Sequence, residues 1–457
     1  MTMTDDASVD ASRVIASQRA FFDGGGTRGT EMRIAVLRRL EQALRDRRDT
    51  MLAALAEDLG KPPIEAFLAE HRFLLDEIRL ICASLERWLK PRRAGNPFYF
   101  WPCRSSVRRE PFGAVLVMAP WNYPIQLSLS PLVAAVAAGN TVVLKPSEHA
   151  QASERFLAEV IADCFPPEHV AVITGGPEVA ESLLDRAFDF IFFTGSSEIG
   201  KQVARKAAEH LTPTVLELGG KCPCVVDKSA DLPATARRIL TGKLFNAGQT
   251  CMAPDFVAAH EDIRQPLVEE LTAALNSLPW EQEMARVINE RHYKRLRGLL
   301  TGREIRKGED HDEALHFAPR ILPDAGWDDP AMNEEVFGPI LPVVGFTDRE
   351  DLIARLRGLP SPLALYAFSR DEDFIQALTE GIRSGSLCVN DTLKQACNLN
   401  LPFGGVGASG HGRYRGKAGV MAFSYERAVT RRFFLPDPFD LSPPRAEMAR
   451  FLMKWLG

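Results

Sequence analysis

The sequence predicts an α/β protein with parallel sheets, two domains and a small β arm. Short apolar segments alternate with helical patterns over residues 111–218, and strict strand-helix succession is typical of a parallel sheet with both faces covered. A second α/β stretch begins near Gly219 and runs to about residue 400. Two extended segments, near 98–110 and 423–434, could pair as a two-stranded arm between domains or subunits. The 457 residues suffice for two or three domains with sizeable cores.

The predicted elements follow in a simple order. Residues 30–90 carry apolar side chains at helical spacing, and Pro91 ends this helical region. The predicted strands are 114–118, 141–144, 170–173, 190–193 and 214–216, and the helices between them lie near 126–138, 151–164, 178–186 and 198–210. Ligands of parallel sheets bind beyond the carboxyl ends of the strands, so functional residues are expected directly after each strand.

Composition and charge argue against several classes of protein. The chain carries 55 Lys and Arg against 60 Asp and Glu, interspersed, with a formal charge of −5. This balance gives no long-range attraction to nucleic acid. No stretch approaches the ~18 apolar residues of a membrane helix. The start, MTMTDDASVD, is acidic rather than basic and apolar, so we expect a cytoplasmic protein.

The eight cysteines are expected to be reduced thiols. Cys222 and Cys224 have no second cysteine pair or histidines at metal-binding spacing, so no metal site is expected. Cys251 differs because it lies in NAGQTCMAPD, a turn-rich loop of small residues where a thiol can be exposed. Taken alone, it is either a nucleophile or an ordinary structural thiol.

Two polar side chains follow apolar strands. Glu217 ends the run TVLELGGK, where a carboxylate is costly unless it is used or paired. It is either a general base or the salt-bridge partner of Lys221 or a nearby arginine. Asn122 lies in PWNYP between Pro120 and Pro124. Its amide could donate to a developing oxyanion, or it is an ordinary turn residue.

Lys145 and Glu148 in VVLKPSE follow another strand, and a cation and a carboxylate three residues apart suit the hydroxyls of a bound ribose. An acidic group there disfavours a 2′-phosphate, so NAD is preferred to NADP. The alternative is a helix start with Ser147 as N-cap and Glu148 in the first turn.

The segment FFTGSSEIGK reads as strand, glycine turn and helix start, which suits an anion such as a pyrophosphate. Compared with the G-x-G-x-x-G fingerprint it keeps Gly195 and Gly200, with Ser197 at the middle position. The segment also follows the fourth predicted strand, whereas the fingerprint normally follows the first. The segment therefore does not match the fingerprint as a sequence pattern, but its turn and helix start still suit a phosphate group.

With these motifs in this order, the sequence resembles the NAD(P)-dependent aldehyde dehydrogenase superfamily, most closely its short class 3 branch. The resemblance spans nearly the whole chain, through ALAEDLGKP, EPFGAVLVMAPWNYP, VVLKPSE, FTGSSEIGK, LELGGK, NAGQTCMAPD, EEVFGPILPV and LPFGGVGASGHG. It implies a Rossmann-type cofactor-binding domain, an α/β catalytic domain and a small β oligomerisation arm. The implied boundaries are 1–97 and 111–218 with part of 400–423 for the first, 219–399 for the second, 98–110 and 424–436 for the arm, and 437–457 for a C-terminal tail helix.

The resemblance also implies a role for each matching residue. The catalytic set is Cys251 as nucleophile, Glu217 as general base and Asn122 as oxyanion-hole amide. The cofactor set comprises Lys145, Glu148, Gly195, Ser196, Glu335, Phe337, Pro120 and Trp121, and the substrate funnel includes Tyr123 and Thr241. The implied reaction is the oxidation of a small-molecule aldehyde to its acid with NAD, NADP being possible, through a thiohemiacetal and a thioester on Cys251.

The sequence departs from the class 3 pattern in places. Thr241 stands where relatives commonly have Trp before Gly-Lys, which predicts a wider funnel that admits bulkier aldehydes. Residues 278–286 look abbreviated, and GREIRKGEDHDEALHFAPRIL is irregular. The branch implies a homodimer. The final helix, RAEMARFLMKWLG, has an apolar face and is too short to cross a bilayer, but it could lie on a membrane, on the protein itself or on a dimer mate.

Three other readings stay open. A cysteine hydrolase would pair Cys251 with a histidine, but nine scattered histidines form no local signature. An acylating relative would pass the thioester to coenzyme A, whereas Glu217 favours water as acceptor. A non-catalytic NAD-binding descendant would have no reason to keep Cys251, Glu217 and Asn122 together.

Overall fold

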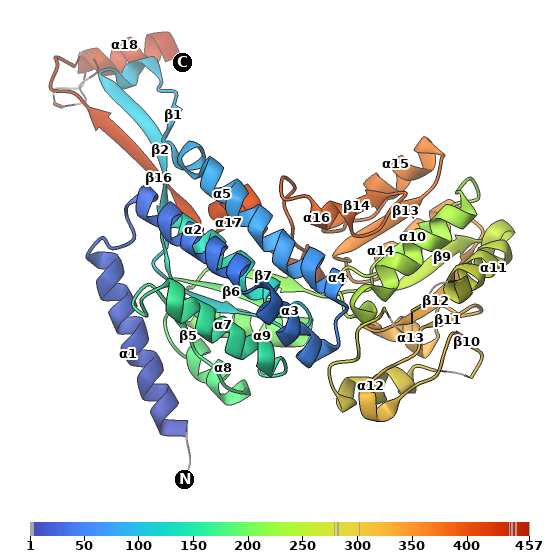
Figure 1. Ribbon diagram of the computed structural model, residues 1–457. Coiled ribbons are helices and arrows are strands. Elements are labelled where there is room, and N and C mark those ends of the chain that lie inside the picture. Colours follow the sequence, from blue (N-terminus) through green and yellow to red (C-terminus); the bar gives the residue numbers. More distant parts are fainter. Residues whose placement is uncertain are drawn as a thin grey trace.

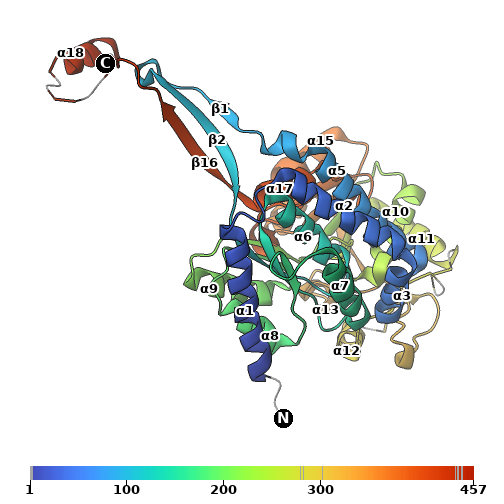
Figure 2. The same ribbon diagram turned by 60° about the vertical axis from the view of Figure 1, so that its left-hand side comes forward.

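A computed structural model describes residues 4–277, 279–280, 283–300, 302–437, 439, 442–443 and 446–456. Two α/β halves lie side by side, and an arm projects from them with the last helix at its tip (Figures 1 and 2). Residues 1–3 of the first predicted domain, three positions of the predicted abbreviated segment (278, 281 and 282) and parts of the predicted tail lie outside the described residues.

The first half contains a six-stranded sheet ordered β15-β7-β6-β3-β4-β5. Its five parallel strands are β3 (Ala114–Met118), β4 (Thr141–Lys145), β5 (Val170–Val172), β6 (Phe190–Gly195) and β7 (Thr214–Leu218), and β15 (Gly410–His411) pairs antiparallel with β7. The helices between strands are α6 (Gln126–Ala138), α7 (Gln151–Cys164), α8 (Pro177–Leu184) and α9 (Ser197–Glu209). The predicted alternation is confirmed. Every residue of α6 is buried, which explains its continuous apolar sequence.

Helices at the start of the chain pack around this half, the first of them on the sheet itself and later ones on the helices α6 and α7. They are α1 (Thr4–Asp23), α2 (Thr30–Asp46), α3 (Arg48–Leu59), α4 (Pro63–Ala66) and α5 (Phe73–Leu89), with a π-helical turn, η1 (Phe67–Arg72), between α4 and α5. The helical region predicted over residues 30–90 is confirmed, although it is broken into several pieces. Helix α1 was not predicted. It is held in place in part by Gln18, whose amide donates to the Val142 carbonyl at 2.8 Å.

The second half contains a seven-stranded sheet ordered β10-β11-β12-β9-β8-β13-β14. Its strands are β8 (Pro223–Val226), β9 (Phe256–His260), β10 (Ile305–Arg306), β11 (Arg320–Leu322), β12 (Ile340–Phe346), β13 (Ala364–Phe368) and β14 (Ser386–Val389). The helices of this half are α10 (Leu232–Leu244), α11 (Glu261–Ser277), α12 (Glu290–Gly298), α13 (Pro330–Asn333), α14 (Arg349–Gly358), α15 (Glu372–Gly381) and α16 (Lys394–Cys397). The chain then returns to the first sheet through β15 and α17 (Gly416–Ala422), which packs on α6.

The arm is a three-stranded antiparallel sheet, so the expectation of two strands was wrong. The strands β1 (Arg92–Ala94) and β16 (Ser424–Arg432) pair on either side of β2 (Cys103–Pro111). Residues 92–94, predicted to lie in the cofactor-binding domain, therefore belong to the arm. Three residues at the start of a turn-rich segment are too few to show an alternating pattern, which is why β1 was missed.

Helix α18 (Ala446–Leu456) lies at the tip of the arm (Figure 2). Phe439 contacts both Phe451 of α18 and Phe98 of the arm, with ring centroids 6.2 and 5.5 Å apart. None of the helices in the described part of the chain has the length and apolar character needed to cross a membrane. In that same part, no group of three or more His, Cys, Asp or Glu side chains is arranged to hold a metal ion.

Candidate active site

The predicted nucleophile, Cys251, follows a strained turn after α10. Asn246, Ala247 and Gly248 have positive φ angles of 54°, 52° and 73°. A left-handed conformation costs a non-glycine residue roughly 1–2 kcal/mol, so surrounding contacts must hold this turn. A Cβ at position 248 would lie 2.2 Å from the Gly338 carbonyl oxygen, so the position requires glycine. Cys251 itself remains half-buried.

Gln249 provides the contacts that fix this turn. Its Nε2 donates to the carbonyls of Asn246 at 3.2 Å and Arg286 at 3.0 Å, and its Oε1 accepts the backbone N–H of Ile288 at 3.0 Å. Its side-chain amide is thus bonded on both sides, so the loop that carries Cys251 is held by side-chain hydrogen bonds as well as by the backbone.

Asn122 lies against the same turn. Its side-chain Nδ2 donates to the Gln249 backbone carbonyl at 3.0 Å, and its backbone carbonyl accepts from Asn246 Nδ2 at 2.9 Å. The residue is buried. A side-chain amide has two N–H groups, and the bond to Gln249 uses one of them. The sequence places Asn122 far from Cys251, and the fold joins their two loops directly.

Glu217 lies in β7, one residue before its end, and is 3% exposed. Neither of its carboxylate oxygens has a hydrogen-bond partner among the residues that the structure describes. The alternative of a salt bridge to Lys221 is wrong, because Lys221 pairs with Asp255 instead. Burial raises the pKa of Glu217 well above its ordinary value, and the positive charges of Arg415 and Arg413 oppose this rise in part. Such a carboxyl is suited to accepting a proton near neutral pH.

The raised pKa makes Glu217 a source of instability at neutral pH. The folded state holds this proton more tightly than the unfolded chain, whose carboxyl has its ordinary value of 4.5. The wild type therefore loses stability as the pH rises from that value toward the folded pKa. We expect Glu217→Gln, which does not titrate, to raise Tm little at about pH 5 and progressively more toward about pH 8. Thermal unfolding across that range is the measurement, and a Tm difference that is independent of pH would contradict the expectation.

Arg415 is a site residue that the sequence reasoning did not single out. It is buried, has a φ of 76°, and its guanidinium lies 4.0 Å from the centre of the Phe403 ring. Burial, with the negative charges of Glu335 and Glu217, raises the pKa of Cys251 to about 12, and Arg415 opposes this rise. Cys251 is therefore a neutral thiol at neutral pH until its environment changes. An arginine within the glycine-rich run HGRYRG was the available signal in the sequence.

Lys145 and Glu148 form an ion pair after β4. Lys145 Nζ donates to Glu148 Oε2 at 2.8 Å. Burial raises the pKa of Glu148, but the hydrogen bond and charge of Lys145, a backbone hydrogen bond and the charge of His149 together outweigh it, so the net pKa is lowered. The alternative of a helix start at Ser147 is wrong, because α7 begins at Gln151 and Ala150 is its N-cap. Lys145 is the last residue of β4, and Glu148 lies in the loop between β4 and α7 and not in the first turn of the helix.

The glycine turn after β6 leads directly into α9. Ser196 is the N-cap, and its Oγ accepts the Ile199 N–H at 3.3 Å. Gly200 brings α9 close to the sheet, because a Cβ there would lie 2.6 Å from a Leu218 methyl group. Gly195 is also required, since its Cβ would lie 2.5 Å from the Phe193 ring. The N-terminus of α9 thus lies at the carboxyl edge of the sheet, where it suits an anion.

These positions fit a dinucleotide. In the sheet, β3 pairs with both β4 and β6, so the loops that follow β4 and β6 lie two strand spacings apart, about 10 Å, at one edge. One loop carries the Lys145 and Glu148 pair and the other the Ser196-capped helix end. An ion pair for hydroxyls and a helix N-terminus for phosphates are the groups that hold NAD(P) in parallel-sheet proteins.

Glu335 lies close to Gly219, where a Cβ would be 2.1 Å from Glu335 Oε2, so glycine is needed. Burial raises the pKa of Glu335 to about 8. Phe337 has a positive φ of 44°, and its ring meets that of Trp121 edge to face at 5.5 Å. Pro120 precedes Trp121 and is half-buried. The loop after β3 and the segment EEVFGP, more than 200 residues apart in the chain, therefore meet, and Glu335 lies near enough to Cys251 to raise the pKa of its thiol.

The two predicted funnel residues occupy different surroundings. Tyr123 is 9% exposed, and its hydroxyl is 2.7 Å from Thr250 Oγ1, next to Cys251 in the chain. Thr241 is exposed on α10, and its Oγ1 donates to the Arg237 carbonyl at 2.8 Å. The fold thus brings Cys251, Glu217, Asn122 and Glu335 together, and it leaves Thr241 exposed on α10.

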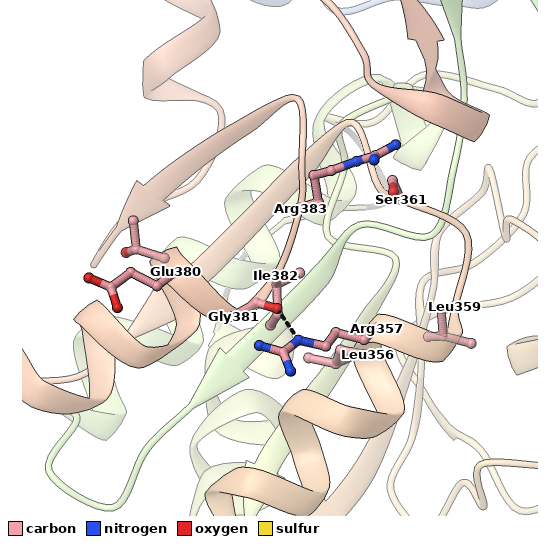
Figure 3. A pocket seen from close by; sticks show the side chains of 9 residues that line it. Leu356, Arg357, Leu359, Ser361, Glu380, Gly381, Ile382 and Arg383 are labelled. Carbon is pink, nitrogen blue, oxygen red and sulfur yellow. Dashed lines mark hydrogen bonds between the residues drawn. The ribbon is translucent and has the colours of Figure 1, made fainter.

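A cavity of about 630 Å³ lies elsewhere, between the ends of α14 and α15 (Figure 3). Its lining residues are Leu356, Arg357, Leu359, Ser361, Thr379, Glu380, Gly381, Ile382 and Arg383. Arg357 Nε donates across it to the Gly381 carbonyl at 2.6 Å. None of the site residues predicted from the sequence lines this cavity.

Comparison with known proteins agrees with the geometry. A model of the aldehyde dehydrogenase family matches residues 1–429. The chain is 39% identical over 434 residues to 4,4'-diapolycopene-4,4'-dial dehydrogenase of Cytobacillus firmus, covering 94% of this chain and 96% of that protein. It is 41% identical over 420 residues to aldehyde dehydrogenase family 3 member B1 of Rattus norvegicus, covering 91% of this chain and 90% of that protein.

Solved structures give the same result. A substrate-bound state of Staphylococcus aureus AldH has a TM-score of 0.94 and 35% identity, covering 98% of this chain and 99% of that one. An aldehyde dehydrogenase of Mycobacterium tuberculosis complexed with NAD+ has a TM-score of 0.85 and 27% identity, covering 95% and 91%. The predicted fold class and class 3 resemblance are confirmed. The chain therefore belongs to the aldehyde dehydrogenase family, as an NAD(P)-dependent enzyme that oxidises aldehydes.

Proposed function

We propose that this enzyme oxidises its aldehyde through a thioester on Cys251, which is hydrolysed by water that Glu217 activates. The observation that carries the proposal is the Glu217 carboxyl, buried without a described hydrogen-bond partner and close enough to Cys251 to raise the pKa of its thiol. A buried carboxyl without a protein partner is costly to the fold, and a role in catalysis accounts for that cost.

In the first step the Cys251 sulfur, once deprotonated, bonds to the aldehyde carbon, and the carbonyl oxygen takes up the electron pair. The unused N–H of the Asn122 amide and the backbone N–H of Cys251 donate to this oxyanion. One such donor is typically worth about 3 kcal/mol in the transition state. The chemistry that NAD(P)+ supplies when bound is that of a hydride acceptor. Lys145, Glu148, Ser196 and Glu335 would hold it.

In the second step Glu217 takes a proton from water as the water oxygen bonds to the thioester carbon. The carbon–sulfur bond then breaks, which releases the acid and returns Cys251 as a thiolate. A raised pKa suits this task, because the carboxylate, once ionised, is a stronger base than an exposed one. The carboxylate of Glu148 favours NAD over NADP by repelling a 2′-phosphate. The six-stranded sheet would form the cofactor-binding domain and the seven-stranded sheet the catalytic domain.

The experiment that tests this function is an assay of reduced cofactor against a panel of aldehydes, with and without coenzyme A. We expect turnover without coenzyme A and no stimulation by it. Absolute dependence on coenzyme A would favour an acylating enzyme. The absence of cofactor reduction with every aldehyde would favour a non-catalytic NAD-binding protein.

Thr241 suggests that the substrates are bulky. Two relatives are named for 4,4'-diapolycopene-4,4'-dial and 4,4'-diaponeurosporen-aldehyde, and Thr241 stands where an indole would narrow the funnel. We expect Thr241→Trp to lower the ratio of kcat/KM for bulky against short aldehydes by at least about 10-fold. Because Thr241 is exposed, the substitution should leave Tm nearly unchanged. An unchanged ratio would remove Thr241 from the funnel.

The arm is the proposed dimer contact of a cytoplasmic enzyme. Phe434, Leu435, Phe98 and Trp101 near its tip are exposed by 110%, 53%, 56% and 52%. Apolar side chains gathered on one projection mark an association surface. We expect light scattering to give the mass of a dimer for the wild type, and we expect Phe434→Asp to weaken the dimer. A monomeric wild type would overturn the dimer contact. Co-sedimentation with liposomes that is lost on deletion of residues 446–457 would favour a membrane contact instead.

A further inference from the structure

We infer that Lys61 and Glu70 are positioning residues that hold the Asn122 amide in place for the oxyanion. The inference rests on the proposed role of Asn122 and adds to it the groups that set its geometry. Neither residue touches the nucleophile, and both precede the predicted sheet in the sequence.

The two side chains form an ion pair inside the protein. Lys61 Nζ lies 2.5 Å from Glu70 Oε1, and both side chains are 0% exposed. Removing two charges from water is expensive, and a buried ion pair is seldom more stabilising than apolar side chains of the same size. Glu70 also lies within the π-helical turn η1, a form that is rare and often found at functional sites. The pair is therefore better explained by the loop that it positions than by a contribution to the stability of the protein.

The remaining polar contacts of the pair go to the loop that carries Asn122. Lys61 Nζ donates to the Asn122 backbone carbonyl at 3.0 Å. Glu70 Oε2 accepts the backbone N–H groups of Ile125 and Gln126 at 3.0 and 3.1 Å, at the start of α6. The pair thus holds the loop at its middle, at Asn122, and at its end, where α6 begins. Its charges are matched to a carbonyl and to a helix N-terminus.

The same segment also holds the loop of the nucleophile. Glu65 Oε2 accepts the backbone N–H of Asn246 at 3.0 Å, and the Asn246 side chain donates to the carbonyl that Lys61 also binds. Helix α4, which contains Glu65, lies where the two halves of the molecule meet (Figure 1). Residues 61–70 therefore fix the Asn122 loop relative to the loop of Cys251.

This arrangement predicts a specific kinetic effect. Donors stabilise an oxyanion because they are already in place when its charge develops. A misplacement of about 1 Å can cost up to about 100-fold in rate. Loss of the Lys61 ammonium removes one of the two hydrogen bonds to the Asn122 backbone carbonyl and leaves only that from Asn246. We expect the carbonyl to shift, and the side-chain amide of the same residue to shift with it.

The test is a double-mutant cycle of Lys61→Met and Asn122→Ala, with kcat and Tm measured for each variant. We expect Lys61→Met to lower kcat by about 10- to 100-fold in the wild type but by less than about 3-fold in the Asn122→Ala background. The loss of Tm should be similar in both backgrounds, and Lys61→Arg should recover part of kcat. Arg320→Met is the matched control, because Arg320 is a buried cation that pairs with Asp310, a half-buried carboxylate, away from the site residues.

Each outcome has a clear meaning. An equal loss of kcat in both backgrounds, or an equal loss in Arg320→Met, would show a general structural effect and overturn the inference. If Asn122→Ala alone leaves kcat unchanged, the proposed oxyanion role fails and the inference falls with it. If Lys61→Met does not fold, Glu70→Gln replaces it in the same cycle, because glutamine keeps the shape of the side chain and an acceptor oxygen but removes the charge. The loss of kcat is then again compared between the wild-type and Asn122→Ala backgrounds.

Discussion

Replacement of Cys251 by serine is expected to lower kcat for aldehyde-dependent cofactor reduction by at least about 10⁴-fold. A serine hydroxyl is a far weaker nucleophile than a thiolate, and no other thiol is placed to substitute for it. Cys222, the thiol whose sulfur contacts the Cys251 carbonyl, is fully buried beneath the loop. Steady-state formation of reduced cofactor with a substrate from the aldehyde panel is the measurement.

The matched control is Cys397→Ser, because Cys397 is an exposed thiol outside the site. Its activity should stay within about 2-fold of the wild type. The Cys251→Ser variant should still bind the cofactor, since Lys145, Glu148 and Ser196 are unchanged. Retention of more than about a tenth of the wild-type kcat by Cys251→Ser would contradict the nucleophilic role.

The second large effect is expected for Glu217→Gln. Loss of a general base typically costs about 10²- to 10⁴-fold. The loss should fall on steady-state turnover, because glutamine keeps the size of the side chain but takes no proton from water. The first turnover should remain, seen as a burst of reduced cofactor close to one equivalent per site. Added hydroxylamine, which attacks a thioester without a base, should restore part of the steady-state rate.

Glu380→Gln is the corresponding control, since Glu380 is an exposed carboxylate that lines the separate cavity. It should leave both the burst and the steady-state rate within about 2-fold of the wild type. Equal losses of burst and steady state in Glu217→Gln would assign Glu217 to an earlier step than hydrolysis.

The elements that the sequence predicted best are those whose signals are local. The spans of β3, α6 and α7 were predicted to the residue. The first two are largely apolar, fully buried runs and the third is an amphipathic pattern, and each is bounded by glycine, proline or a polar residue. Gly139 shows why, since it ends α6 in a left-handed conformation that favours glycine. Asn122 follows β3 as the same reasoning predicted, whereas Glu217, predicted to follow a strand that ends at residue 216, lies within β7.

Other features depend on contacts between distant parts of the chain. The helical pattern of residues 30–90 conceals the π-helical turn, because the apolar spacing changes little over one turn. Lys61 and Glu70 read as ordinary surface charges of a helical region, and only the fold buries them against Asn122. Lys221 pairs with Asp255 and therefore not with Glu217. No local sequence pattern predicts this ion pair, because its two residues lie far apart in the chain.

The most direct test of the account is the mass of the quenched enzyme. Glu217→Gln, mixed with aldehyde and NAD+ and stopped with acid after one turnover, should carry one acyl group in place of a thiol hydrogen. Peptide mapping should locate this group on Cys251, and the Cys251→Ser, Glu217→Gln double variant should carry none. A full burst of reduced cofactor without an acyl group on Cys251 would contradict the account.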